Sequence, residues 1–351
     1  MTEKQDLHSM LPSELEEYLI KLGEPKFRAK QLFVRLQDGT PIGEISNLPK
    51  ALRERLTESS LDVIPKVERR LVSKIDGTVK YLFRLHDGEC IESVLMKYKH
   101  GNTLCISSQV GCRMGCRFCA STLAGRVRNL LPSEMLGQII AATRDSGERV
   151  SNVVMMGIGE PLDNFDNVVR FLRLVNHPDG LNIGYRHISL STCGVVPRIY
   201  DLAEIDIPIT LSISLHAATD EARSEIMPVN KKWNIEELLS ACVAYYKKTG
   251  RRISFEYTLI HGKNDSEEDA VRLARLLTAA FRNTGAPIHV NLIRVNEVEE
   301  IGFRHGSTES ANRFAAILNG RGCVATVRRR LGSNIEAACG QLRRKSAENK
   351  D

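Results

Sequence analysis

The sequence predicts an α/β protein built around a partial (β/α)6 barrel that is open on one side. After residue 100, six short apolar stretches alternate with segments of helical periodicity, which is typical of a parallel sheet with right-handed crossovers. The stretch before it alternates between apolar and polar residues, and the N-terminal region is helical. Six units, rather than the eight of a closed barrel, favour a splayed barrel, but periodicity alone also fits a doubly wound sheet.

Residues 1–70 are predicted to form a small helical module. Ser13 is a suitable N-cap for its first helix. Three short helices are expected because apolar residues recur at helical spacing within three segments: 15–22, 27–36 and 48–56.

Residues 71–100 are predicted to form a β-hairpin extension of the barrel. Apolar residues alternate from Val79 to Leu85, Asp87 and Gly88 supply a turn, and a second strand follows over 90–97. The barrel is assigned to 101–333, and a C-terminal segment to 334–351. Its expected strands are 104–107, 152–156, 187–191, 209–215, 253–260 and 288–293, with helices over 133–142, 165–175, 235–248 and 267–281.

The composition is that of an ordinary globular protein, with 42% hydrophobic and 26% charged residues among 351. No apolar run approaches the ~20 residues of a membrane span, and the charged N-terminus is not a signal peptide. Nine cysteines, three of them in one motif, indicate a reducing compartment, so we expect a cytoplasmic protein without a membrane partner.

The net charge of +6 gathers near the two ends of the chain. It indicates either a solvated surface or one that faces phosphate groups. The cations concerned include Lys26, Arg28, Lys30 and Arg35 near the N-terminus, Lys66, Arg69, Arg70 and Lys74 after them, and Arg328, Arg329, Arg330, Arg343, Arg344 and Lys345 near the C-terminus.

Three cysteines, Cys112, Cys116 and Cys119, are the most informative residues of the chain. A 4Fe-4S cluster normally takes four cysteine ligands, so three close together leave one iron open to bind a cofactor. Structural zinc would require a second ligand pair at similar spacing, and none follows downstream. Other cysteines that stand alone are expected to be buried and inert: Cys90, Cys193, Cys242 and Cys323.

Polar residues and glycines follow the predicted strands where the carboxyl ends of a parallel barrel gather its chemistry. Each alone is equally typical of a turn or a cap, but together they suit a ribose, a carboxylate and an adenine edge. A dinucleotide site is not indicated, because the Gly-x-Gly pair lacks a third glycine. The residues are Gly159, Glu160, Ser191, Ser214, His216 and Asn296, and the apolar Leu215 lies between Ser214 and His216.

The cysteine spacing CxxxCxxC resembles that of radical S-adenosylmethionine (radical SAM) enzymes. The segments 104–112, 156–162, 212–216 and 337–342 resemble the RlmN/Cfr family of radical SAM RNA methyltransferases, and the likeness runs from the N-terminal module almost to the C-terminus. It implies one 4Fe-4S cluster on the three cysteines and two molecules of S-adenosylmethionine per turnover, bound by the strand-end residues. Pro161, which follows Glu160, resembles the residue found at this position in the branch that methylates carbon 2 of adenine. The carbon-8 branch, which confers antibiotic resistance, tends to have alanine there.

The resemblance also implies roles for three outlying residues. Cys339 would receive a methyl group, a radical formed on that methyl would add to adenine, and Glu92 would accept the ring proton. Cys105 would then attack Cys339, leaving a disulfide and the methylated base.

The substrates implied by the resemblance are 23S ribosomal RNA in the peptidyl-transferase region and a transfer RNA adenine beside the anticodon. The N-terminal module would bind RNA, and a flavodoxin-like protein would supply electrons. Three alternatives stay open at this point. They are the carbon-8 reaction, a metal-binding RNA module without catalysis, and a radical SAM activase that acts on proteins.

Overall fold

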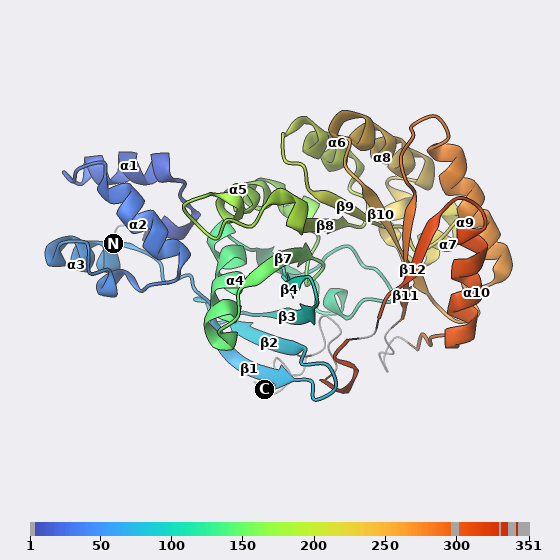
Figure 1. Ribbon diagram of the computed structural model, residues 1–351, viewed down its shortest axis with the longest axis horizontal. Coiled ribbons are helices and arrows are strands. Elements are labelled where there is room, and N and C mark those ends of the chain that lie inside the picture. The colour runs from blue at the N-terminus through green and yellow to red at the C-terminus, as the bar shows by residue number, and fades with distance from the viewer. Residues whose placement is uncertain (1–3, 296–301, 330, 336–341, 343–351) are drawn as a thin grey trace.

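The structure, a computed structural model, describes residues 4–295, 302–329, 331–335 and 342. Figure 1 shows a group of helices at the N-terminal end, a large sheet at the centre, and further helices around the outer side of the sheet. No helix within these ranges is both long and apolar enough to cross a membrane. The α-helices are α1 (Pro12–Lys21), α2 (Arg28–Gln37), α3 (Lys50–Ser59), α4 (Pro132–Ser146), α5 (Phe165–Asn176), α6 (Val196–Glu204), α7 (Asp220–Ile226), α8 (Ile235–Thr249), α9 (Glu267–Ala280) and α10 (Thr308–Asn319).

The helices α1, α2 and α3 confirm the predicted N-terminal helical pattern and share one hydrophobic cluster. Leu15 and Leu32 are fully buried in it, and Leu174 of α5 joins it from the barrel. Polar contacts add to this junction, since Ser133 Oγ at the start of α4 donates to Asp6 Oδ2 at 2.6 Å. The N-terminal helices are therefore packed directly against the barrel.

The N-cap predicted for the first helix is wrong. Helix α1 begins at Pro12, and Leu11 rather than Ser13 is its cap residue. Proline suits the first helical position because its φ is already helical and the missing N–H would have had no helical partner. The N–H of Leu11 instead donates to Glu14 Oε2 at 2.7 Å, which closes the first turn.

One ten-stranded sheet carries both the predicted hairpin and the predicted barrel strands, and all of these are confirmed. Its order is β1-β2-β3-β4-β7-β8-β9-β10-β11-β12. The strands β1 to β4 pair antiparallel, and every pair from β4 to β12 is parallel. Strand β12 extends the parallel part beyond the six predicted strands. The strands are β1 (Lys66–Val72), β2 (Val79–Arg84), β3 (Cys90–Tyr98), β4 (Gly101–Cys105), β7 (Val150–Met155), β8 (Ile188–Thr192), β9 (Thr210–Ser214), β10 (Ile253–Leu259), β11 (His289–Arg294) and β12 (Val324–Val327).

The two faces of the barrel sheet differ in polarity. Its outer face packs against the surrounding helices through one large apolar core. Its inner face carries hydrogen-bonded polar side chains, because alternate residues of a strand point to opposite faces. Ser189 and Ser212 are 2.9 Å apart through their hydroxyls, and Glu256 accepts hydrogen bonds from Ser254 at 3.0 Å and Asn291 at 2.7 Å. The interior of this open barrel is therefore suited to a polar ligand.

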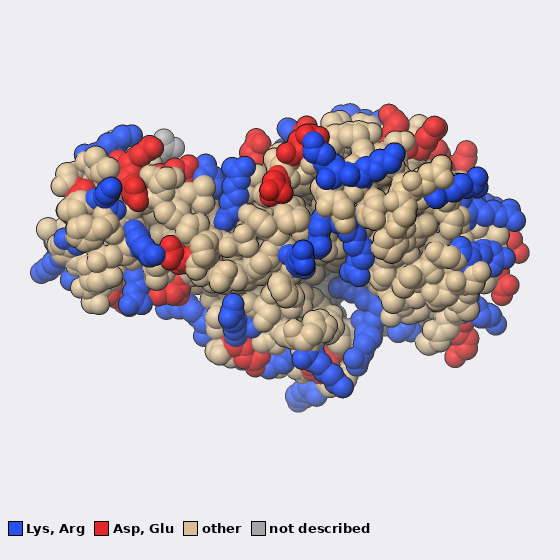
Figure 2. Space-filling view, turned by 45° about the horizontal axis from the view of Figure 1, so that its top comes forward, with Lys and Arg blue, Asp and Glu red and all other residues tan. Residues whose placement is uncertain are grey.

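Positive side chains border the hollow at the middle of the face seen in Figure 2. At the N-terminal end, however, much of the positive charge is already neutralised by carboxylates. Three of the cations there form salt bridges, namely Arg28 with Glu24 at 2.9 Å, Lys30 with Asp179 at 2.9 Å and Arg35 with Asp38 at 3.0 Å.

We expect His8 to make the fold sensitive to acid. His8 is buried at the junction between the N-terminal helices and the barrel. Burial lowers its pKa from 6.5 to about 4, although Asp6 and Asp62 act in the opposite direction. Below pH 6.5 His8 is therefore protonated in the unfolded chain but stays neutral in the folded chain. The free energy of unfolding then falls by about 1.4 kcal/mol per pH unit until the pH reaches the pKa of the folded state.

Urea unfolding of the wild type and of His8→Gln at pH 7 and pH 5 measures this effect. The variant should lose less stability than the wild type between the two pH values. His261→Gln is a control, because the side chain of His261 is 69% exposed. Equal losses in the wild type and His8→Gln would contradict the assignment.

Candidate active site

The three clustered cysteines lie in a loop that a small two-stranded sheet closes at its base. Strand β5 (Gln109–Gly111) pairs antiparallel with β6 (Arg126–Asn129), and the N–H of Cys112 donates to Gly125 O at 3.0 Å. Gly111 has a φ of +76°, and a Cβ there would lie 1.9 Å from Gly125 O. Only glycine can take this position, because any side chain would force the two strands apart.

A cavity of about 270 Å³ brings this loop together with the predicted strand-end residues. The predicted residues that line it are Cys112, Cys116, Cys119, Gly159, Glu160, Ser191, Ser214 and His216. They come from the loop and from the carboxyl ends of three neighbouring strands, β7, β8 and β9, as expected for a parallel barrel.

The donor set fits an iron–sulfur cluster better than a single metal ion. Within the part of the chain that the structure describes, no three or more His, Cys, Asp or Glu residues are arranged to hold one ion. One zinc ion would need all its ligands within ~2.3 Å of a single point, whereas a 4Fe-4S cube distributes its thiolates over separate irons. Three thiols that share the wall of one cavity match the second arrangement.

Two of these thiols are neutral before any metal binds. Burial raises the pKa of Cys112 to about 12, and negative charge on Cys119 and Glu160 adds to the effect. Burial also raises the pKa of Cys116 far above its usual value. Ligation must therefore displace protons from these sulfurs, as is general for thiolate sites.

Glu160 presents a buried carboxylate at the end of β7. Its Oε1 accepts the N–H of Leu162 at 3.0 Å, and its Oε2 accepts the N–H of Cys193 at 2.7 Å. Burial raises the pKa of this carboxyl group, and no residue in the described ranges forms a salt bridge with it. Such a carboxylate is suited to a cationic group of a ligand, which would supply the missing charge.

The chain after β7 lies unusually close to the chain after β4. The N–H of Gly157 donates to Ile106 O at 3.0 Å, and those of Ser108 and Gln109 both donate to Ile158 O. A Cβ on Gly157 would lie 2.6 Å from Ile106 O. Glycine is therefore required here by the contact between the two backbones.

His216 is held as a neutral imidazole. Its Nδ1 accepts the N–H of Thr258 at 2.9 Å, so in the neutral ring the proton is on Nε2. Burial, together with the positive charge of Arg223, lowers the pKa of His216 to about 3. The ring also meets Phe118 of the cysteine loop edge to face, with centroids 4.8 Å apart. His216 is thus fixed in orientation and has one N–H left for a ligand.

Leu215, a predicted cofactor contact, does not line the cavity. The side chain of Leu215 packs in the main hydrophobic core, and its carbonyl accepts a hydrogen bond from Arg223. Asn296 and Cys339 lie outside the described residues.

Glu92 and Cys105 lie on the inner face of the antiparallel strands, outside the cysteine cavity. Cys105 of β4 is paired with Val94 of β3, which follows Glu92 at the two-residue spacing of one sheet face. Glu92 is buried and forms a salt bridge with the buried Lys80, with Nζ and Oε2 3.1 Å apart.

The flanks of the Cys339 segment lie against the same face. Leu331 packs on the cluster that contains Cys105, and Leu342 packs on Leu82 and Cys90. Two points of the C-terminal chain are therefore fixed beside the strands that carry Cys105 and Glu92.

Several cavity residues were not predicted from the sequence. The structure confirms that Cys193 is buried, but places it in the cavity wall, where its backbone N–H donates a hydrogen bond to Glu160. Strand register brings Glu256 to the cavity, since it pairs with Ser214 across β9 and β10 and shares its inner face. The others include Met156, Thr192, Thr258 and Arg328.

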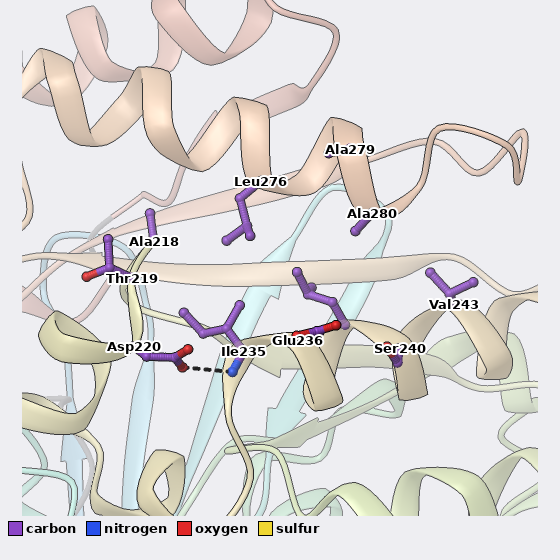
Figure 3. A pocket seen from close by; sticks show the side chains of 11 residues that line it. Ala218, Thr219, Asp220, Ile235, Glu236, Ser240, Val243, Leu276, Ala279 and Ala280 are labelled. Atoms are coloured by element: carbon purple, nitrogen blue, oxygen red, sulfur yellow. Dashed lines mark hydrogen bonds between the residues drawn. The ribbon is translucent and has the colours of Figure 1, made fainter.

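A second cavity of about 540 Å³ lies between α8 and α9 and shares no residue with the first (Figure 3). Its walls are mainly apolar, with Leu276 and Val243 on opposite helices. At one end Asp220 accepts the N–H of Ile235 at 2.9 Å. No thiol or imidazole lines it.

Comparison with known proteins identifies the family. The family "Ribosomal RNA large subunit methyltransferase N-terminal domain" matches residues 5–61, and the "Radical SAM superfamily" matches residues 106–274. The probable dual-specificity RNA methyltransferase RlmN of Alkaliphilus oremlandii (strain OhILAs) is 53% identical over 348 residues, which cover 99% of this chain and 100% of the relative. The chain belongs to the RlmN family of radical SAM RNA methyltransferases.

Other members of the RlmN family and a solved structure agree. The probable dual-specificity RNA methyltransferase RlmN of Clostridium botulinum (strain Eklund 17B / Type B) is 52% identical over 332 residues, 94% of each chain. A crystal structure of a radical SAM methyltransferase from Sphaerobacter thermophilus has a TM-score of 0.90 and 42% identity, and covers 96% of this chain and 98% of that one. The predicted cofactors, a 4Fe-4S cluster and S-adenosylmethionine, are those of this superfamily.

Gly159→Ala should damage the cavity. Gly159 has a φ of +111°, and a Cβ there would lie 2.7 Å from both the N and the Cβ of Gln109. Because backbone must move, we expect affinity for S-adenosylmethionine to fall about tenfold or more, equivalent to ~1.4 kcal/mol. Calorimetric titration of the reconstituted protein measures it.

Gly88→Ala is the matched control for this substitution. Gly88 also has a positive φ, +87°, but a Cβ there would meet nothing within 4 Å. The Gly88→Ala variant therefore has the backbone strain of an alanine at positive φ but no steric collision of its Cβ. Unchanged binding by Gly159→Ala, or an equal loss in both variants, would contradict the steric explanation.

Proposed function

We propose that this chain methylates carbon 2 of an adenine in 23S ribosomal RNA, and of an adenine beside the anticodon of transfer RNA. The full-length likeness to probable dual-specificity RNA methyltransferases supports this reaction. The observation that carries it is the adjacency of two sites on one sheet. A thiol-lined cavity stands at the parallel strand ends, and the antiparallel strands next to it hold Cys105 and Glu92.

The cysteines Cys112, Cys116 and Cys119 are proposed to hold the cluster, which together with S-adenosylmethionine supplies radical chemistry when bound. Glu160 is proposed to bind the amino group of S-adenosylmethionine, because it offers a buried carboxylate without a cation from the described residues. The remaining contacts with this cofactor are proposed for Gly159, Ser191, Ser214, Leu215 (through its backbone), His216 and Asn296.

The chain itself is proposed to carry the methyl group and release the product. Cys339 would bear the methyl, and Glu92 would accept the proton lost from the adenine ring. Lys80 orients the carboxylate of Glu92 through their buried salt bridge. The thiol of Cys105 would attack the sulfur of Cys339 to free the base, and the resulting disulfide must be reduced before the next turnover.

The partners are proposed from the charge and from the chemistry. RNA phosphates would meet the exposed cations of edge strand β1, such as Lys66 and Arg69, and those around the hollow in Figure 2. The reaction also requires an external electron donor, for which we propose a flavodoxin-like protein. We assign the protein to the cytoplasm, where its RNA substrates and a reducing environment are found together.

Product analysis tests the proposed reaction. The reconstituted protein, incubated anaerobically with S-adenosylmethionine, a reductant and unmodified 23S ribosomal RNA, should form 2-methyladenine, detected by mass spectrometry of the digested RNA. Cys112→Ala should form none. Exclusive formation of 8-methyladenine would assign the chain to the carbon-8 branch, and absence of any methyladenine would refute the proposal.

Cys105→Ala should stop the reaction at a late stage. Without the thiol that attacks Cys339, the protein should remain covalently joined to RNA, visible as a band of retarded mobility in a denaturing gel. Cys90→Ala is the matched control, because Cys90 is another buried thiol on the inner face of β3 and contacts Leu342. Normal turnover by Cys105→Ala, or the same adduct in both variants, would contradict the assigned role.

A further inference from the structure

The side chain of Arg223 lies at the centre of a buried polar contact behind the cysteine cavity. Its Nη2 donates to Cys193 O at 2.7 Å and Ser214 O at 3.1 Å, and its Nε donates to Leu215 O at 3.1 Å. Its Nη1 donates to Asn230 Oδ1 at 2.9 Å. A guanidinium from α7 therefore joins the carboxyl ends of β8 and β9 to η6 (Pro228–Lys231).

The charge of Arg223 is not explained by these hydrogen bonds. The side chain is fully buried, and no carboxylate of a described residue forms a salt bridge with it. Burial lowers its pKa, but a guanidinium stays charged at any physiological pH. Burying a cation costs free energy, whereas a neutral amide could also donate to carbonyl oxygens. A buried anion nearby would account for the charge.

Two kinds of anionic group lie near Arg223: the carboxylate of Asp220, held through Asn230, and the thiols of the cysteine cavity. Cys193, whose carbonyl binds Arg223, lines the cavity together with the three clustered cysteines. Cys116 packs in one apolar cluster with Cys193 and with Ile226, which follows Arg223 on α7. The cysteine loop is also bonded to α7 through its backbone, since the N–H of Arg117 donates to Ile226 O at 2.9 Å.

We propose that Arg223 is the built-in counter-charge of the iron–sulfur cluster, and that it makes the cluster easier to reduce. A fixed cation in a medium of low dielectric constant stabilises whichever state carries one more electron. Charge and burial around a cluster are among the features that set its reduction potential. The inference rests on the proposed function only in requiring a cluster on Cys112, Cys116 and Cys119.

Arg223→Met removes the charge and keeps the bulk of the side chain, and Arg223→Lys keeps the charge without the planar fork. The readouts are iron content and the midpoint potential of the anaerobically reconstituted cluster, followed by electron paramagnetic resonance. Arg223→Met should make reduction about tenfold less favourable, a shift of ~59 mV to lower potential for one electron. The potential of Arg223→Lys should return most of the way to the wild-type value, because the charge is kept. A merely structural role would not predict this recovery.

Arg144→Met is the matched control. The Nη1 of Arg144 donates to the carbonyl of Gly39 at 2.7 Å, and the residue does not line the cysteine cavity. Its loss removes an arginine–carbonyl bond without removing charge near the cluster. The potential of this variant should equal that of the wild type.

A second variant covers the case in which Arg223→Met does not fold. Asn230 Nδ2 donates to Asp220 Oδ1 at 2.9 Å, so the exchange Asp220→Asn/Asn230→Asp moves one carboxylate onto the guanidinium at constant net charge. It should lower the potential in the same direction. Wild-type potentials in folded, iron-loaded Arg223→Met or in the exchange variant would overturn the proposal. A wild type without a cluster signal would refute the proposed function instead.

Discussion

The contact between two loops, 106–109 after β4 and 157–160 after β7, is the constraint on which the rest of the site depends. Ser107 is its centre: its hydroxyl donates to Glu92 O at 2.7 Å and accepts the N–H of Ile158 at 3.0 Å. Gln138 of α4 satisfies the N–H and the carbonyl of Ser107 at 2.8 and 3.0 Å. One buried residue thus connects β3, which carries the proposed base Glu92, to the loop 157–160 and to α4. Neither the cysteine cavity nor the site of Glu92 can therefore move alone.

At the carboxyl ends of the barrel strands, backbone groups that have no partner in a neighbouring strand form hydrogen bonds with polar side chains. The end of β7 is held by Ser107, those of β8 and β9 by Arg223, and that of β10 by Asn264, whose Nδ2 donates to the carbonyls of His216 and Thr258. Buried backbone groups require partners, and these side chains supply them where the ladder stops. The same residues therefore complete the fold and shape the cavity.

The features that could be predicted from the sequence are those that depend on a pattern within one short segment. Periodicity predicted α1 to α5, α8, α9 and most strands, but not α6, α7 or α10, and cysteine spacing drew attention to the cysteine loop. The sequence could not give β12, whose four residues are too short for a period, nor the orientation of Leu215, whose side chain enters the core although its neighbours face the ligand cavity. Contacts set by register, such as Glu256 beside Ser214, depend on how distant strands align and are absent from any single stretch of sequence.

The salt bridges of the N-terminal helices have a consequence for association with RNA. Affinity for a polyanion depends on ionic strength through the counterions released as protein cations replace them. Arg28, Lys30 and Arg35 already have carboxylate partners, so a phosphate arriving there exchanges one anion for another. Formal charge at this end therefore overstates the electrostatic attraction that these helices would offer to RNA phosphates.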